Sequence, residues 1–569
     1  MKTTSRFAAA AFGALVLAAP PSHAQPGETP AAAAPAAAAP AARTPAETFT
    51  GRIEVTAVEI MIEVRDAAGR LPANLAAADF EVLEDGVPVT VIGLDVPPPP
   101  RSRSPRPIPE PPRSGDQAWR FVVYFESALT DPRTVKQAAR ALFQQAPELT
   151  SLGSVEVVVA DPSPRLVLPF TRDPEQLQEA LHGLTRPRRT AGALAKIRYD
   201  FLAFRNLRED REGMETIGQI RAAVQQEHFL IERQLERFRR WLDGYGNLPA
   251  SALILVSDGF DLDPGEFYLQ ATSSPGIEQR MTTELLRYRI DEVAESVSRE
   301  LSARGWTGIV LAPRGVPPPD AAADASLSGR DRYRSIGESG GAGPGSASPV
   351  SLLQRPTEPL LLLAEESGGE ILTNLKKTVP ALERLGQRLR LTYQVDRPAD
   401  GRRHRLEVRL RRPDVELRAP RWTSSPTAAQ IGRSRARRLL ALDQAAGDIP
   451  VEVRLELAAE RRDDGARRAR LTVLFDLDEL SPVLAGPRLP IRFTFGVALA
   501  GAPPFVHQVT EEITLPEPTG QPGRLPRFDY AVDLDLPPES GRIAVVVEEP
   551  ASGSWGGNVA QQPPGETDR

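Results

Sequence analysis

The chain contains no cysteine among its 569 residues. This absence excludes disulfides, thiol catalysis and zinc–thiolate sites, and it leaves no cysteine to carry a lipid anchor. Histidine is also scarce, and the histidines beyond the first 24 residues show neither the spacing of metal ligands nor a neighbouring carboxylate pair; they are His182, His228, His404 and His507. We therefore do not expect an enzyme.

Long apolar runs are missing as well, because no segment approaches the ~20 apolar residues that a transmembrane helix needs. The chain begins with Lys2 and Arg6, continues with an apolar run from Phe7 to Ala19, and then has small residues before Gln25. This pattern predicts a secretory signal peptide that is cut after Ala24. We expect an exported protein, periplasmic or extracellular, without an integral membrane segment.

Neither excess basic charge nor a hydrolase motif in a suitable context is present. The formal net charge is −6, so nothing indicates a nucleic acid as the partner. The stretch Gly337–Gly341 matches the Gly-x-Ser-x-Gly pattern of a serine hydrolase, but it lies among Gly, Ser and Pro residues instead of between a strand and a helix. A serine hydrolase is therefore not predicted.

Two short apolar runs end abruptly in polar residues. Phe121–Phe125 is followed by Glu126, and Ala252–Val256 is followed by Ser257 and Asp258. Such runs are typical of strands that are buried on both faces of a parallel sheet. Helical and strand patterns alternate around them, which predicts a doubly wound, mostly parallel α/β domain whose strand ends meet at one edge.

Alternating apolar residues before and after this region predict all-β parts. Residues 50–96 supply too few strands to close a core, so we expect Leu389–Arg418 to pair with Ile53–Val91, and we expect a hairpin turn at Glu84–Gly86. The expected order is a signal peptide (1–24), an Ala/Pro-rich linker (25–49), a β unit (50–97), a Pro/Arg-rich linker (98–116), the α/β domain (117–388) with a disordered loop (314–350), strands completing the β unit (389–423), a connecting helix (424–448), a C-terminal β-sandwich (449–550) and a disordered tail (551–569).

Six local sequences, in this order, resemble the von Willebrand factor A-related proteins that acidobacteria and other Gram-negative groups export. They are Ala78–Gly86, Phe121–Thr130, Phe170–Asp173, Val256–Gly259, Leu363–Gly369, and Tyr393 with His404–Val408. The resemblance implies a binding module with a metal-ion-dependent adhesion site, built from Asp-x-Ser-x-Ser, a threonine from a later loop and a further aspartate. Oxygen ligands of this kind suit Mg²⁺ or Mn²⁺.

The chain departs from that motif. Glu126 stands in the position of the first aspartate, Ala128 replaces a serine, and Thr130 keeps a hydroxyl. Thr190 is the candidate for the loop threonine, and Asp258 matches the last acid. The resemblance thus implies a degenerate metal site.

We expect a partner protein to bind at this edge, where further candidates lie beside the metal set. These candidates are Ser127, Ser257, Asp261 and Asp263. Asp261 and Asp263, with Glu266, are open to two interpretations, a cation site rebuilt from another loop or a solvated acidic loop with turn chemistry.

Two helical segments are also open to two interpretations. In 212–242, Ile217, Val224, Ile231 and Phe238 recur every seven residues, which fits a helix packed on its own domain or one that self-associates. The arginines of the connecting helix, at 433, 435, 437 and 438, fit a solvated face or a surface for an acidic partner. The leading function is non-catalytic protein–protein recognition at the sheet edge. The alternative is a structural or assembly component of the cell envelope that uses its β domains and long helix.

Overall fold

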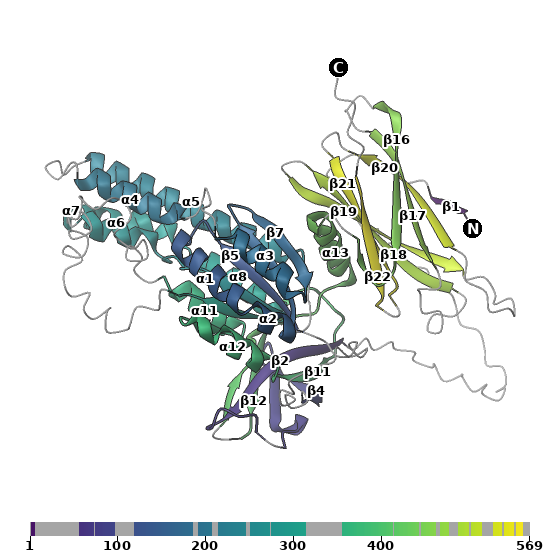
Figure 1. The fold of residues 1–569 in the computed structure, drawn as a ribbon, viewed down its shortest axis with the longest axis horizontal. Coiled ribbons are helices and arrows are strands. Elements are labelled where there is room, and N and C mark those ends of the chain that lie inside the picture. Colours follow the sequence, from purple (N-terminus) through teal and green to yellow (C-terminus); the bar gives the residue numbers. More distant parts are fainter. Residues whose placement is uncertain are drawn as a thin grey trace, which may run out of the picture.

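The computed structural model describes residues 2–5, 56–72, 74–96, 119–185, 192–206, 214–245, 251–272, 275–313, 356–412, 415–442, 445–461, 467–476, 488–499, 502–514, 527–536, 540–550 and 553–561. Figure 1 shows an α/β domain, a smaller β unit below it and a C-terminal sandwich beside it. Both predicted linkers, the loop 314–350 and most of the predicted signal peptide lie outside the described residues.

The α/β domain contains one six-stranded sheet. Its strand order is β10-β9-β8-β5-β6-β7, and its neighbours are parallel except for β6 and β7, so that β7 is an antiparallel edge strand. The strands are β5 (Trp119–Glu126), β6 (Gly153–Ala160), β7 (Pro164–Thr171), β8 (Ser251–Val256), β9 (Trp306–Leu311) and β10 (Glu370–Leu372). The doubly wound fold predicted from the sequence is confirmed.

Helices cover both faces of this sheet because its strands are apolar on both sides. Phe121, Val123 and Phe125 of β5 pack with α1 (Pro132–Gln144), α2 (Ala146–Leu152), α3 (Pro174–Gly183) and α12 (Thr378–Leu385). Val122 and Tyr124 face the end of α5 (Met214–Leu242), α8 (Asp291–Ala303) and α11 (Glu358–Glu366).

The long helix α5 packs within its own domain. The four residues of its heptad stripe, Ile217, Val224, Ile231 and Phe238, are at most 7% exposed. The first part of the stripe contacts α4 (Ala193–Asn206), α6 (Pro264–Thr272) and α7 (Pro275–Leu285), and the last part contacts the sheet. The stripe therefore offers no free apolar surface for self-association. None of the described helices combines the length and apolar character that crossing a bilayer takes.

The smaller β unit joins strands from both sides of the α/β domain. Its seven-stranded sheet has the order β13-β2-β11-β4-β3-β12-β14. The strands are β2 (Thr56–Asp66), β3 (Phe80–Glu84), β4 (Val87–Asp95), β11 (Leu389–Val395), β12 (Arg403–Leu410), β13 (Val415–Arg418) and β14 (Trp422–Ser424). β11 pairs with β2 and β4, and β12 pairs with β3, which is the pairing predicted from the sequence.

The hairpin between β3 and β4 turns at Asp85 and Gly86. Both residues have positive φ angles, 52° and 80°. Two consecutive residues of this kind form the tight turn whose twist matches antiparallel strands, and Asp-Gly is a favoured pair for it. The predicted turn is confirmed.

The C-terminal part is a two-sheet sandwich. One sheet holds β1 (Lys2–Ser5), β20 (Arg527–Leu536), β17 (Arg467–Asp476) and β16 (Val451–Arg461); the other holds β15 (Ala446–Gly447), β22 (Trp555–Gln561), β21 (Ser540–Glu548), β18 (Arg488–Leu499) and β19 (Ala502–Thr514). Apolar residues of both sheets, such as Phe475 and Phe493, share one core. Cleavage after Ala24 would remove β1 and leave β20 at the edge of its sheet.

The prediction of a disordered tail over 551–569 is wrong for β22. This strand pairs with β21 from Trp555 to Gln561. Gly556 and Gly557, which resemble loop residues in the sequence, are needed here because a Cβ would meet the Ile449 carbonyl oxygen at 1.8 Å and the Val545 carbonyl oxygen at 2.5 Å. Glycine in a strand often marks such a close approach of another backbone.

The helix α13 (Ala428–Leu442) packs on the five-stranded sheet and also contacts the α/β domain. The sequence favours a solvated face for its arginines and leaves a surface for an acidic partner as the alternative, but three of the four, Arg435, Arg437 and Arg438, pair with acids of this chain. Arg435 forms an ion pair with Glu548. Arg438 Nη2 lies 3.0 Å from the carboxylate of Glu156, a fully buried residue of β6. Burial raises the pKa of Glu156 to about 7, and Arg438 opposes this rise.

We expect Arg438→Ala to loosen the contact between α13 and the α/β domain. The change removes a charged hydrogen bond to a buried carboxylate, a loss on the order of 1–3 kcal/mol. Hydrogen exchange should become faster in peptides from β6 and α13, and small-angle scattering should show a wider range of shapes. Arg433→Ala is the control, because Arg433 is exposed on the same helix. Equal effects of both changes would contradict the assignment.

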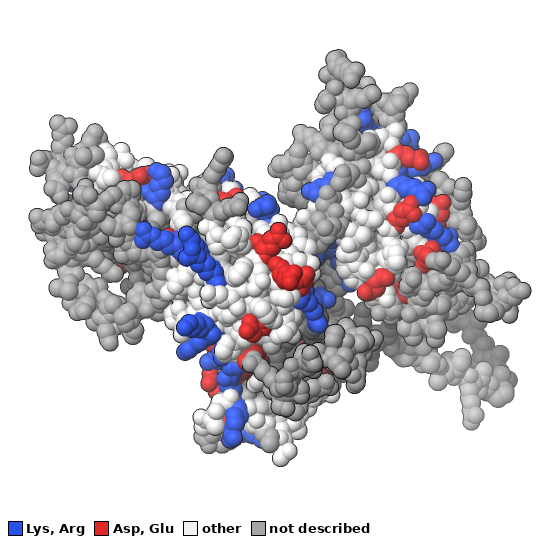
Figure 2. Space-filling model, in the orientation of Figure 1, with Lys and Arg blue, Asp and Glu red and all other residues white. Residues whose placement is uncertain are grey.

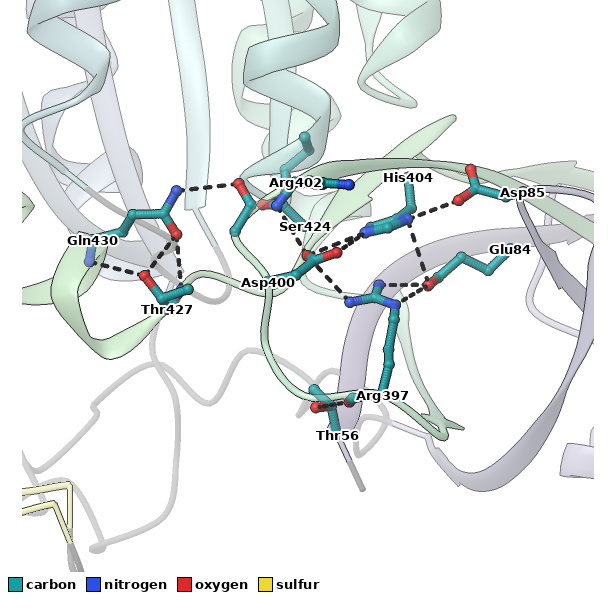
Figure 3. Close-up of polar contacts among 12 residues, drawn as sticks. Thr56, Glu84, Asp85, Arg397, Asp400, Arg402, His404, Ser424, Thr427 and Gln430 are labelled. Atoms are coloured by element: carbon teal, nitrogen blue, oxygen red, sulfur yellow. Dashed lines mark hydrogen bonds and ion pairs between the residues drawn. The ribbon is translucent and has the colours of Figure 1, made fainter. Parts of the chain in front are cut away.

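A cluster of charged residues joins the β3–β4 turn to β12 and the loop before it (Figure 3). His404 Nδ1 lies 2.7 Å from Asp85, and Nε2 lies 3.2 Å from Asp400. Arg397 pairs with Glu84 at 2.6 Å and with Asp400 at 3.3 Å. Burial by itself would lower the pKa of His404, but the hydrogen bonds to the two aspartates outweigh it and raise this pKa. The imidazole thus connects the β3–β4 turn to β12.

We expect the stabilisation by His404 to depend on pH. Because the folded-state pKa is raised, the contribution is complete below the unfolded value of about 6.5 and is lost as the pH rises through the folded value. His404→Gln should therefore speed hydrogen exchange in peptides from β3 and β12 much more at about pH 5.5 than at about pH 8.5. The exposed His182 gives the control variant His182→Gln. A difference that does not change with pH would contradict this expectation.

Candidate functional site at the carboxyl edge of the sheet

The ends of β5 and β8 meet at one edge of the sheet, as predicted. The two strands are parallel neighbours, with Phe125 opposite Val256. Glu126 and Asp258 follow directly at this edge. Contacts with α1 show that the segments converge, because Asp258 accepts hydrogen bonds from the backbone N–H of Asp131 at 2.9 Å and from the Thr134 hydroxyl at 2.8 Å.

Asp258 is thus a structural acceptor at the start of α1. Its side chain is only 7% exposed. Asp131, the N-cap of α1, accepts from the Arg133 N–H at 2.7 Å, so the two aspartates together satisfy the N–H groups of the N-cap and of Arg133, which have no partner inside the helix.

Glu126 is buried and bonds to its own loop. Its carboxylate accepts from the backbone N–H of Ala128 at 3.1 Å. Burial raises the pKa of Glu126 to about 8, while the N–H groups of Ala128 and Leu129 lower it. Glu126 also lines a cavity of about 50 Å³ between the sheet, α5, α8 and α11. Burial therefore favours the protonated form of its carboxyl group.

The hydroxyl residues of the edge are buried too. Ser127 and Thr130 are 0% exposed, and neither hydroxyl has a hydrogen-bond partner among the described residues. The Ser257 hydroxyl accepts from the Gly259 N–H at 3.0 Å. Thr190 and the Gly337–Gly341 stretch lie outside the described residues.

Asp261 belongs to a different, fully buried cluster. It pairs with Arg198 Nη1 at 2.7 Å, and Arg198 Nε donates to Glu227 at 2.9 Å. The Tyr268 hydroxyl donates to the same glutamate at 2.7 Å. This cluster connects α4, α5 and α6 to the loop after β8. Asp263 accepts from the Gly265 N–H at 3.1 Å, which is turn chemistry at the start of α6.

These residues do not fit the metal site that the resemblance implies. Ala128 offers no side-chain ligand, burial disfavours the charged form of Glu126, and Asp258 already accepts two hydrogen bonds. Within the described ranges, no group of three or more His, Cys, Asp and Glu side chains lies close enough to hold a metal ion. A hard cation needs about six oxygen ligands, so we derive no chemistry from a metal here.

Sequence reasoning missed the arginines that pair with buried acids. Besides Arg198 and Arg438, Arg388 is 3% exposed and joins the β unit to the α/β domain. It donates to Thr307 of β9 at 2.8 Å and to Glu63 of β2 at 3.2 Å. The signal that could have revealed Glu156 is an acid inside the apolar run Val155–Val159. The partners of Arg198 and Arg388 leave no comparable local signal.

We expect Glu126→Gln to change how stability depends on pH. Because burial raises the pKa of Glu126 from 4.5 to about 8, ionisation should lower the free energy of unfolding of the wild type by up to ~1.4 kcal/mol per pH unit between these values. Glutamine does not ionise, so the variant does not lose free energy of unfolding in this way. The advantage of Glu126→Gln in thermal midpoint should therefore grow from about pH 5 to about pH 8.

The exposed Glu148 supplies the control variant Glu148→Gln, which should show no such trend. A constant difference between Glu126→Gln and the wild type over this range would show that Glu126 is ionised in the folded protein.

Comparisons with known proteins find no matching family model and no matching curated protein. Two solved structures each align with 47% of this chain and 98% of their own length, at 12% identity. One is the conserved hypothetical protein BatB from Bacteroides thetaiotaomicron, with a TM-score of 0.22. The other is an aerotolerance-related membrane protein from Bacteroides fragilis, with a TM-score of 0.21. Similarity at these scores carries no argument about function, so the fold assignment stands on the sheet order itself.

Proposed function

We propose that the chain is an exported, non-catalytic assembly protein that binds another protein through surfaces away from the sheet edge. The observation that carries this proposal is the burial of the edge. Glu126, Ser127, Thr130, Ser257 and Asp258 are all at most 7% exposed. A partner cannot contact these side chains unless the cover of the edge moves.

The role of the edge in this proposal is structural. Asp258 holds the start of α1. Asp261 holds the helices α4 to α6 through Arg198. Export follows from the pattern of the first 24 residues, with its basic start and its apolar run from Phe7 to Ala19.

Arginine contacts between the parts of the chain support an assembly role. Arg388 connects the β unit to the α/β domain, and Arg438 connects the C-terminal sandwich to it through α13. Three parts held in this way present composite surfaces at their junctions. Such surfaces suit a protein that positions a partner.

Metal-dependent recognition at the edge is the second candidate. The buried hydroxyls of Ser127 and Thr130 favour it, because they lack partners among the described residues and are groups that Mg²⁺ accepts as ligands. The two candidates differ in what a metal titration would measure.

We expect calorimetric titration of the full chain with Mg²⁺ or Mn²⁺ to give no saturable heat. Asp258→Ala should nevertheless lower the thermal midpoint, because it leaves the Asp131 N–H and the Thr134 hydroxyl unpaired, at a cost on the order of 1–3 kcal/mol each. In pull-downs from envelope extract, capture of a partner protein should be the same with and without chelator.

Saturable metal binding that Asp258→Ala abolishes would replace the proposal with the second candidate. Turnover of a small molecule by the purified chain would refute both.

A further inference from the structure

A groove rich in arginine lies where the α/β domain, the β unit and α13 meet. Its volume is about 630 Å³, within the range of ligand sites. The arginines that line it come from all three parts and are Arg304, Arg402, Arg403, Arg433 and Arg437. Two carboxylates, Asp243 and Glu300, also line it, so the groove carries an excess of three positive charges.

Contacts inside the groove use both carboxylates. Arg304 pairs with Glu300 at 2.8 Å and with Asp243 at 2.5 Å. Arg403 reaches Glu300 at 3.4 Å, and Arg437 reaches Asp243 at 3.4 Å. Each acid therefore already serves two guanidinium groups.

Arg402 and Arg433 take no part in these ion pairs. Both are exposed, and neither side chain has an ion-pair partner within the described part of the chain. They come from different parts of the chain, Arg402 from the loop before β12 and Arg433 from α13. Two unpaired guanidinium groups in one groove match a ligand with more than one carboxylate.

The loop that carries Arg402 is fixed in place (Figure 3). The backbone N–H of Arg402 donates to Asp400 at 2.9 Å, and Asp400 also contacts His404. Gln430 Nε2 of α13 donates to the carbonyl oxygen of Gly401, the residue before Arg402, at 3.1 Å. A site that is ordered before binding loses less entropy when the ligand arrives.

We propose that this groove binds an acidic peptide segment of a partner protein. The proposal rests on the assembly function above and names the chemistry of its partner. Ile431 and Pro426 in the lining add apolar contact, and Ser434 adds a hydroxyl that can bond to a peptide amide.

Charge makes a nucleic acid the poorer occupant. The whole chain carries −6, and acidic and basic side chains both occur on the described surface of the face drawn in Figure 2. A polyphosphate backbone needs a continuous row of basic contacts, and Asp243 and Glu300 interrupt the groove.

The test is fluorescence anisotropy of the full chain with labelled hexaglutamate. We expect saturable binding that weakens strongly when NaCl is raised from about 0.05 M to about 0.5 M, as screening requires. Arg402→Glu combined with Arg433→Glu should weaken binding by at least about tenfold, since it replaces two charge-assisted contacts with repulsion. The thermal midpoint should stay unchanged, because both residues are exposed and make no ion pair in the described residues.

Arg140→Glu combined with Arg468→Glu, at exposed positions on α1 and β17, controls for the change in net charge and should leave the affinity within about twofold. Absent binding, an equal loss with this control variant, or tighter binding of a labelled thymidine hexanucleotide would overturn the proposal. If the wild type and the double variant capture the same partner from envelope extract equally, the groove fails while the assembly function stands. If the wild type captures nothing, the assembly function fails.

Discussion

Pairs of arginine with a buried carboxylate hold the elements and the parts of this molecule together. Arg198 pairs with Asp261 and Glu227 inside the α/β domain, Arg388 pairs with Glu63 of the β unit, and Arg438 of α13 pairs with Glu156. Arginine suits this task because its planar guanidinium reaches several partners at once and stays charged when buried. Only five of the 69 basic residues are lysines. An unpaired buried charge is far more costly than a pair, so these contacts favour one arrangement of the parts over others.

The fold could be predicted where the signal was local. The apolar run Phe121–Phe125 gave a strand buried on both faces, and the Asp85-Gly86 pair gave the turn. Prediction failed where contacts between residues far apart in the sequence determine the local structure. Gly556 and Gly557 resemble a loop in the sequence, yet they lie in a strand because the backbone near Ile449 approaches them. In the sequence Arg438 resembles a solvated residue, and only the structure shows that it pairs with Glu156.

The position of the candidate site could be predicted from the sequence, but the burial of its side chains could not. Parallel strands place Glu126 and Asp258 at one edge whatever covers them, so their convergence follows from the strand pattern. Their burial depends on packing by α5, α8, α11 and the start of α1, which no local pattern of the sequence encodes. The groove at the junction could not be predicted from the sequence either, because its arginines come from three separate parts of the chain.

The nested order of the chain has a consequence for biogenesis. β2, β3 and β4 are synthesised first, but their partners β11 and β12 begin only at Leu389, after the whole α/β domain. Closing so long a loop costs entropy that a compact intervening domain reduces by bringing its two ends together. The early strands therefore wait with unpaired edges while the α/β domain forms, an interval when a chaperone would protect them.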